Sequence, residues 1–147
     1  MQVIEILAIK GRALFTIGPE KDLSAAVAVM AEQELGSLVV IDHGHMVGML
    51  TFREVLAALN QKEAAWDTFS VADVMIRNPM TATPDTDVDS LRRLMVGSPQ
   101  RYTPVMDGAT LLGVVSFHDV ARAMLEEQTF ENHMLRNYIA DRPAASA

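Results

Sequence analysis

Two short segments of the sequence place a hydroxyl side chain three residues ahead of a carboxylate, directly after an apolar run. They pair Thr51 with Glu54 and Ser116 with Asp119. A helix that begins at such a point leaves backbone N–H groups without partners, so the hydroxyl would lie where anions are attracted. The carboxylate would follow on the same face, one turn along, and could accept hydrogen bonds from a diol. The same spacing also forms a helix capping box, so a purely structural role remains open.

The residue types argue against disulfide bonds, metal sites and nucleophilic catalysis. The chain has no cysteine, which excludes a disulfide framework, a thiolate zinc site and a cysteine nucleophile. Its four histidines include no helical His-x-x-x-His pair, so we expect no metal site. Ser116 has His118 two residues on, but side chains at that spacing do not face each other on a helix. We therefore do not expect an enzyme.

The composition limits the protein class. The chain has 147 residues, of which 50% are hydrophobic, and a net charge of −7 from 12 basic and 19 acidic side chains. This length suits one domain or two small halves that share a core. The acidic balance argues against a broad nucleic-acid face or an anionic membrane surface as partner. No segment has the roughly 20 apolar residues of a membrane span, and the start lacks a signal peptide, so we expect a cytoplasmic protein.

The sequence repeats itself at an offset of 65 residues without a gap. Between residues 12 and 59, 11 of 48 positions are identical to the shifted copy, where about one in fifteen would match by chance. The identical pairs include Arg12/Arg77, Pro19/Pro84, Asp22/Asp87, Gly48/Gly113 and Phe52/Phe117. The chain is therefore expected to contain two copies of one unit.

Each copy predicts the same series of elements, β-α-β-β-α. A short extended piece (residues 14–17 or 80–83) ends before a proline, and a helix follows whose N-cap is Asp22 or Asp87. Two β-type runs with an Asp/Gly-rich turn come next, at 37–41 and 46–50 in the first copy and at 102–106 and 111–115 in the second. The last helix of each copy begins at Thr51 or Ser116.

The strands are continuously apolar, so we expect their sheets to be covered by helices in an α/β (α+β) fold. Each copy alone would have a thin core, so we expect the two copies to pack against each other about a pseudo-twofold axis. The expected boundaries are 1–62 for the first repeat, 63–70 for a packed linker, 71–127 for the second repeat and 128–147 for a C-terminal helix and tail. Apolar residues of that last helix would close the module's own core or form a dimer contact.

The repeat resembles the tandem CBS domain pair, or Bateman module, over about nine-tenths of the chain. The second copy carries the closer match, in Val-Ala-Asp-Val-Met at 71–75, Arg-Tyr-Thr-Pro-Val-Met-Asp at 101–107 and Gly-Val-Val-Ser-Phe-His-Asp at 113–119. The first copy keeps Gly-Met-Leu-Thr-Phe-Arg-Glu at 48–54 but has Val39 where the family usually has proline. The resemblance implies a regulatory module for adenosine compounds such as AMP, ADP, ATP, NAD or S-adenosylmethionine, commonly as a homodimer.

The resemblance also implies two ligand clefts between the copies. In each, adenine would lie between apolar side chains, the carboxylate would accept the ribose hydroxyls, and basic groups would meet phosphate oxygens. One cleft would use Ser116, His118, Asp119, Arg101, Tyr102, Phe15, Leu35 and Gly36. The other would use Thr51, Arg53, Glu54, Gly36, Ile76, Met80 and Gln100.

Two departures from the family pattern weaken the second of these clefts. Glu54 is one methylene longer than the usual aspartate, and Ile76 replaces a frequent threonine. The sequence therefore favours the Ser116 cleft, in a stand-alone nucleotide sensor that modulates an unidentified partner protein. The alternative is a ligand-free dimerisation or protein-docking module.

Overall fold

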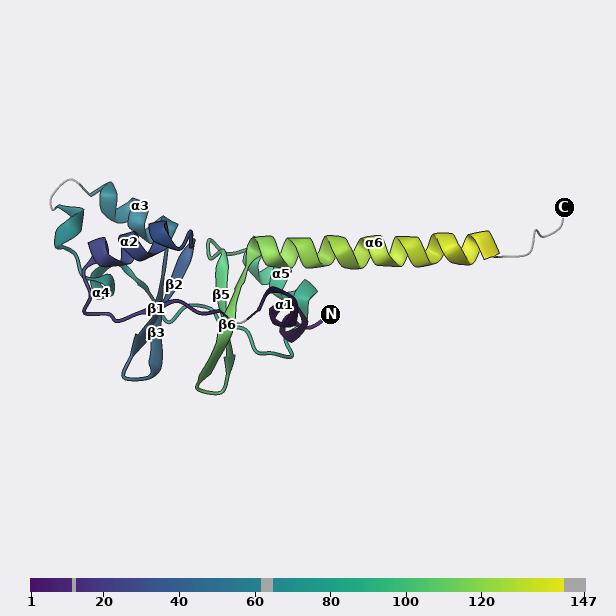
Figure 1. The fold of residues 1–147 in the computed structure, drawn as a ribbon, viewed down its shortest axis with the longest axis horizontal. Coiled ribbons are helices and arrows are strands. Elements are labelled where there is room, and N and C mark those ends of the chain that lie inside the picture. Colours follow the sequence, from purple (N-terminus) through teal and green to yellow (C-terminus); the bar gives the residue numbers. More distant parts are fainter. Residues whose placement is uncertain (12, 62–64, 142–147) are drawn as a thin grey trace.

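The computed structural model describes residues 1–11, 13–61 and 65–141 and has two repeated halves lying side by side (Figure 1). In sequence, the first copy contains α1 (Val3–Lys10), β1 (Thr16–Ile17), α2 (Leu23–Glu32), β2 (Ser37–Asp42), β3 (His45–Thr51) and α3 (Phe52–Leu59). After a short 3₁₀ turn, η1 (Trp66–Thr68), the chain continues through α4 (Val71–Val74), β4 (Ile76–Arg77), α5 (Val88–Val96), β5 (Tyr102–Asp107), β6 (Thr110–Ser116) and α6 (Phe117–Asp141). The mixed α+β architecture, the two hairpins and the helices that follow them are as the sequence predicts.

The strands form a sheet in the order β1-β2-β3-β4 and a hairpin of β5 with β6. Strand β4 belongs to the second copy in sequence, yet it pairs with β3 of the first, through Gly48 with Arg77 and Met49 with Ile76. The extended piece expected at 80–83 is reduced to one parallel bridge between Ala82 and Val105. Proline on both sides, at 79 and 84, leaves few residues there that can take part in a ladder.

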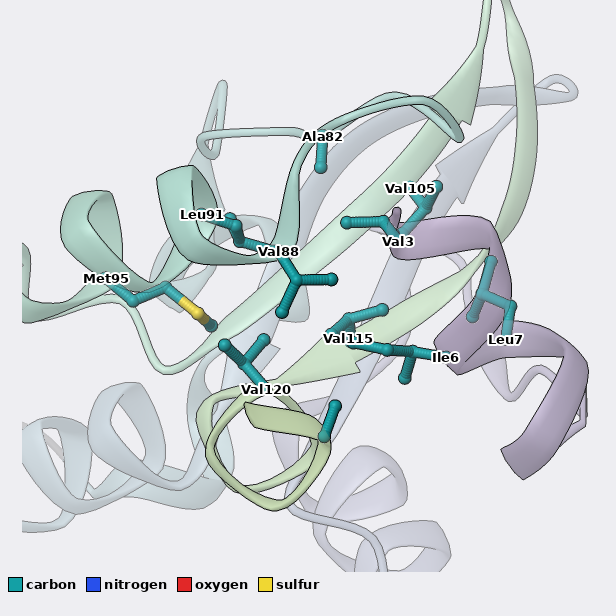
Figure 2. Close-up of a cluster of buried hydrophobic side chains, with 11 residues drawn as sticks. Val3, Ile6, Leu7, Ala82, Val88, Leu91, Met95, Val105, Val115 and Val120 are labelled. Atoms are coloured by element: carbon teal, nitrogen blue, oxygen red, sulfur yellow. The ribbon is translucent and has the colours of Figure 1, made fainter. Parts of the chain in front are cut away.

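Each half has its own hydrophobic core. Each core is completed by a helix that belongs, in sequence, to the other copy. The first core contains Leu23, Ala26, Met30, Leu38, Val40, Leu50, Val55, Ala58, Val71 and Met75. The second core contains Val3, Ile6, Leu7, Ala82, Val88, Leu91, Met95, Val105, Val115, Val120 and Ala123 (Figure 2). Helix α1 thus packs on the second hairpin, whereas α4 packs on the first sheet. Trp66 and Phe69 of the linker pack against the first core, as expected.

Helix α1 is fastened to the second half by its backbone and by close packing. Backbone N–H groups of Val3 and Ile4 donate to the carbonyls of Thr86 and Pro84, each at 2.9 Å. Leu7 is almost fully buried and lies where a side chain on Gly113 would be, because a Cβ there would be 2.8 Å from a Leu7 methyl carbon. The glycine in β6 therefore allows α1 to approach the strand closely. This close packing fixes the position of the last turn of α1.

The last helix, α6, is continuous and extends well beyond the body of the molecule (Figure 1). Its first turns are packed on the second core through Val120 and Ala123. The apolar residues further along are exposed, so they do not close the module's own core as one sequence interpretation proposed. They are Leu125, Phe130, Met134, Leu135, Tyr138 and Ile139, with 54–69% of their surface accessible. Among the described residues, no helix is both long enough and apolar enough to cross a membrane.

Candidate functional site

A large cavity lies between the two copies, beside the N-terminus of α3. It has a volume of about 660 Å³, within the usual range for small-molecule sites. We call it the α3 cleft. Its lining residues come from α3, from the segment around α4 and β4, and from the loop that leads into β5. They are Thr51, Phe52, Arg53, Glu54, Ala57, Ala58, Gln61, Phe69, Asp73, Val74, Ile76, Ser98, Pro99, Gln100, Arg101 and Tyr102.

The hydroxyl and carboxylate of the α3 cleft are held together at the point where β3 becomes α3. Glu54 Oε1 accepts hydrogen bonds from the Thr51 backbone N–H at 2.8 Å and from the Thr51 hydroxyl at 2.6 Å. The carboxylate thus caps the helix, as a capping-box residue does. A carboxylate has about four acceptor sites, so further acceptor capacity remains on Glu54. The structural role proposed from the sequence does not exclude a binding role here.

Two arginines from different copies line the α3 cleft. Arg101 is held in place, because its Nη1 donates to the carbonyls of Met95 at 2.8 Å and Ser98 at 2.9 Å. Its guanidinium also lies 5.2 Å from the centre of the Phe117 ring, within the range of a cation–π interaction. Arg53 is exposed in the first turn of α3 and has no ion-pair partner among the described residues. The cleft therefore combines an arginine held by backbone carbonyls with an arginine that forms no ion pair in the part of the chain that the structure describes.

A second, smaller cavity of about 190 Å³ lies near the N-terminus of α6, and we call it the α6 cleft. It is lined by Lys10, Gly11, Ala13, Leu14, Phe15, Glu34, Leu35, Gly36, Ser37, Tyr102, Val114 and Ser116. Here the capping box is fully reciprocal. The Ser116 N–H donates to Asp119 Oδ2 at 2.9 Å, and the Asp119 N–H donates to the Ser116 hydroxyl oxygen at 3.0 Å.

The carboxylate of Asp119, in the first turn of α6 and next to the α6 cleft through Ser116 and Lys10, already has a cation beside it. Lys10 Nζ lies 2.6 Å from Asp119 Oδ2 and also donates to the carbonyl of Val114 at 3.0 Å. Burial alone would raise the pKa of Asp119, but the hydrogen bonds from Lys10 and Ser116 and the charge of Lys10 outweigh burial and lower that pKa. Asp119 is therefore held in its ionised form by groups of the chain itself.

Tyr102 forms a wall between the two clefts, since it lines both. Its ring lies against Gly36 of the other copy, and a Cβ on Gly36 would be 1.9 Å from the phenol oxygen. Only a glycine leaves room for this contact. The tyrosine thus separates the α3 cleft from the α6 cleft.

The structure brings most of the predicted site residues together, with some in a different grouping. Arg101 lines the α3 cleft and not the α6 cleft, because its guanidinium turns toward the carbonyls at the end of α5. Gly36, which the sequence analysis assigned to both clefts, lines only the α6 cleft. The predicted residues that line neither cleft are Met80, His118 and Asp119. His118 is exposed, and the backbone of Met80 is engaged by the Gln100 side chain at 3.0 and 2.7 Å.

Sequence reasoning favoured the Ser116 cleft and missed Lys10. In the structure, the α3 cleft, which contains Thr51, is larger than the α6 cleft, which contains Ser116. The signal for Lys10 was a basic residue directly before Gly11, at the end of an apolar segment. Nothing in the local pattern, however, places that segment beside the second copy. Among the described residues, no group of three or more His, Cys, Asp or Glu side chains could hold a metal ion.

Comparisons with known proteins agree with the repeat and the fold. A family model described as CBS domain matches residues 8–61 and again residues 71–126. An uncharacterized 17.7 kDa protein of Acidianus ambivalens is 30% identical over 120 residues, which are 80% of this chain and 71% of that protein.

Solved structures extend the comparison. A CBS-domain containing protein from Agrobacterium tumefaciens superposes with a TM-score of 0.80 at 30% identity, over 84% of this chain and 99% of that one. CBSX2, a CBS-pair protein of Arabidopsis thaliana, was solved in complex with AMP. It superposes with a TM-score of 0.68 at 24% identity over 79% of this chain and 91% of that chain, a likeness of fold.

Proposed function

We propose that this chain, which belongs to the CBS domain family as a tandem pair of CBS domains, is a regulatory sensor that binds an adenine nucleotide in its α3 cleft. The single observation that carries the proposal is the cavity of about 660 Å³ between the copies, which has two carboxylates, Glu54 and Asp73, and two arginines in its lining. We propose a binding role and no catalytic step. The absence of cysteine suits a reducing compartment, and we propose the cytoplasm.

The chemistry of the lining supports an adenosine ligand with phosphate groups. Apolar side chains such as Val74 and Ile76 offer a surface for the adenine ring. Glu54 has remaining acceptor capacity for ribose hydroxyls, as the family resemblance implies. Arg53 and Arg101 supply positive charge for phosphate oxygens. AMP, ADP, ATP and NAD share these features, and CBSX2 provides an example of an AMP complex in this fold.

A ligand in the α3 cleft would contact both copies at once. Thr51 and Glu54 belong to the first copy, whereas Arg101 and Tyr102 belong to the second. A nucleotide that binds one relative arrangement of the copies better than another would shift the population toward that arrangement. A coupling of about 1–3 kcal/mol would be typical of such a sensor. We propose that the shift alters the activity of a partner protein.

Ligand binding is tested by thermal unfolding and equilibrium dialysis with AMP, ADP, ATP and NAD. A nucleotide at 100 times its Kd should stabilise the chain by about 2.7 kcal/mol. Glu54→Gln should weaken binding, whereas Glu32→Gln, a matched change on the exposed surface of α2, should not. If none of the four nucleotides binds the wild-type chain, the proposal fails and the docking-module alternative gains support.

We also propose that the chain forms a homodimer through α6. The outer part of this helix carries Phe130, Met134 and Tyr138 at a spacing of four residues, which places them on one face. All three side chains are more than half exposed. Most helical stability in proteins comes from packing of an apolar face, so packing against a second copy of the same helix would stabilise this outer part. The apolar face would then be buried.

A further inference from the structure

We propose that Lys10 acts as a built-in counter-ion that closes the α6 cleft to nucleotides, so that each chain binds one nucleotide and not two. This inference rests on the proposed function of the α3 cleft and adds a residue that determines how many sites are available. Its basis is the direct contact of the Lys10 ammonium with the carboxylate that would otherwise receive the ribose.

The contacts of Lys10 use the groups that a nucleotide would need. Its Nζ lies 2.6 Å from Asp119 Oδ2 and 3.0 Å from the carbonyl oxygen of Val114, at the end of β6. The same Asp119 oxygen also accepts the Ser116 N–H at 2.9 Å. Oδ1 of Asp119 keeps its acceptor sites, but a ribose diol that used both carboxylate oxygens would have to displace the charge-assisted hydrogen bond from Lys10 to Oδ2, which is among the stronger kinds in proteins.

The fold holds Lys10 in this position. Lys10 is the last residue of α1, and Gly11 follows it with a φ of 87°, a conformation that favours glycine. Helix α1 is fixed on the second half by the contact of Leu7 with Gly113 and by two backbone hydrogen bonds at its start. The side chain of Asp119 is only 20% exposed, so the ion pair is partly protected from solvent. Lys10 is thus placed by the core and not by a free loop.

The α3 cleft shows what the equivalent element looks like without such a cation. Glu54 accepts hydrogen bonds from Thr51 alone among the described residues, and no basic side chain forms an ion pair with it there. Met75, which the 65-residue offset places at the position of Lys10, is apolar and lies beside Gly48. The open cleft measures about 660 Å³ and the one lined by Lys10 about 190 Å³.

The number of sites can be measured by equilibrium dialysis at saturation, with a radiolabelled form of whichever of AMP, ADP, ATP and NAD binds the wild-type chain most tightly. We expect one nucleotide per wild-type chain. Lys10→Met removes the ammonium, and we expect two nucleotides per chain. Lys10→Gln, which keeps a hydrogen-bond donor near Val114, serves as a second variant. At a nucleotide concentration too low to fill a cleft weakened by Glu54→Gln, the double variant Lys10→Met/Glu54→Gln should bind one nucleotide, in the α6 cleft.

The outcomes separate this inference from the proposed function. Two nucleotides bound per wild-type chain, or one nucleotide in both folded Lys10 variants, would overturn the role of Lys10 and leave the nucleotide sensor intact. If the wild-type chain binds none of the four nucleotides, the proposed function fails. In that case Lys10→Met is assayed with all four, and binding by the variant alone supports closure by Lys10, whereas no binding by it rejects closure.

Discussion

The phenol oxygen of Tyr102 lies where a side chain on Gly36 would begin, with only 1.9 Å between that oxygen and an ideal Cβ. This contact joins the two copies at the wall between the clefts. Gly36→Ala should therefore displace the tyrosine and destabilise the chain by about 1 kcal/mol, the low end of the range for overpacking, because Tyr102 is half-buried and lies beside two cavities.

Urea unfolding tests this contact in a double-mutant cycle. In a Tyr102→Ala background the added methyl group of Gly36→Ala meets no ring, so its cost should largely disappear. Equal costs in both backgrounds would show that the two residues do not interact in solution. A change at Gly44, which has no neighbour within 4 Å of an added Cβ, cannot serve as a steric control because its φ of 80° favours glycine. Ala28→Ser on the exposed face of α2 is the better control.

The ion pair of Lys10 with Asp119 should make stability depend on pH in a defined direction. The pKa of Asp119 is lowered in the folded chain, so its contribution is complete above the ordinary aspartate value near 3.9. The contribution is lost as the pH falls through the lowered folded pKa. The stability difference between the wild-type chain and Asp119→Asn should be about 1 kcal/mol at pH 7.

Urea unfolding at pH 7, 5 and 3 measures this difference. It should be the same at pH 7 and 5 and should decrease at pH 3. Lys10→Met should remove most of the difference at every pH, because the variant lacks the cation that lowers the pKa. A difference that already disappears between pH 7 and 5 would contradict the assignment to Asp119.

Arg53 should contribute to phosphate binding and not to adenosine binding. It lines the α3 cleft and has no ion-pair partner among the residues described. Arg53→Gln should therefore lower the affinity for ADP about ten-fold, as expected for one lost hydrogen bond to a charged group. The affinity for adenosine should change less than two-fold. Arg136→Gln, on exposed α6, is the matched control, and equal losses for ADP and adenosine would argue against a phosphate contact.

The exposed face of α6 should determine the oligomeric state. Met134→Glu and Leu135→Glu each place a charge among apolar side chains that would be buried between two copies, so both should convert a dimer to a monomer. Thr129→Glu, which lies off the apolar face, should leave the dimer intact. Light scattering after size exclusion measures the mass. A wild-type chain that is monomeric at high micromolar concentration would reject the proposed dimer.

Most of the fold could be predicted because the two copies of the repeat carry the same pattern of strands, turns and helices. The two hairpins and their following helices have strong local signals, such as the Asp/Gly-rich turns and the hydroxyl-x-x-carboxylate capping boxes. The weak entry segment at 80–83 was overestimated, because two prolines limit its pairing. Periodicity predicted helical structure beyond residue 128, where the structure has the continuous α6, but gave no information about whether a partner covers its apolar face.

The site was harder to predict than the fold, because its lining and its ion pairs depend on contacts between distant segments. The residues of the α3 cleft follow from the repeat, yet the preference for the Ser116 cleft ignored Lys10. That lysine is 109 residues away from Asp119 in sequence. Only the placement of α1 against β6 brings the two together, and that placement depends on a tertiary contact of Leu7 with Gly113.

The exchange of α1 and α4 between the halves has a consequence for how the chain folds. Neither copy, cut out of the chain at the boundary of its repeat, would contain the helix that seals its own hydrophobic core. Val3, Ile6 and Leu7 would be separated from the β5–β6 hairpin, and Val71 and Met75 from the β2–β3 hairpin. The two halves are therefore interlocked, and the chain should unfold in one cooperative transition in which loss of either half releases the other.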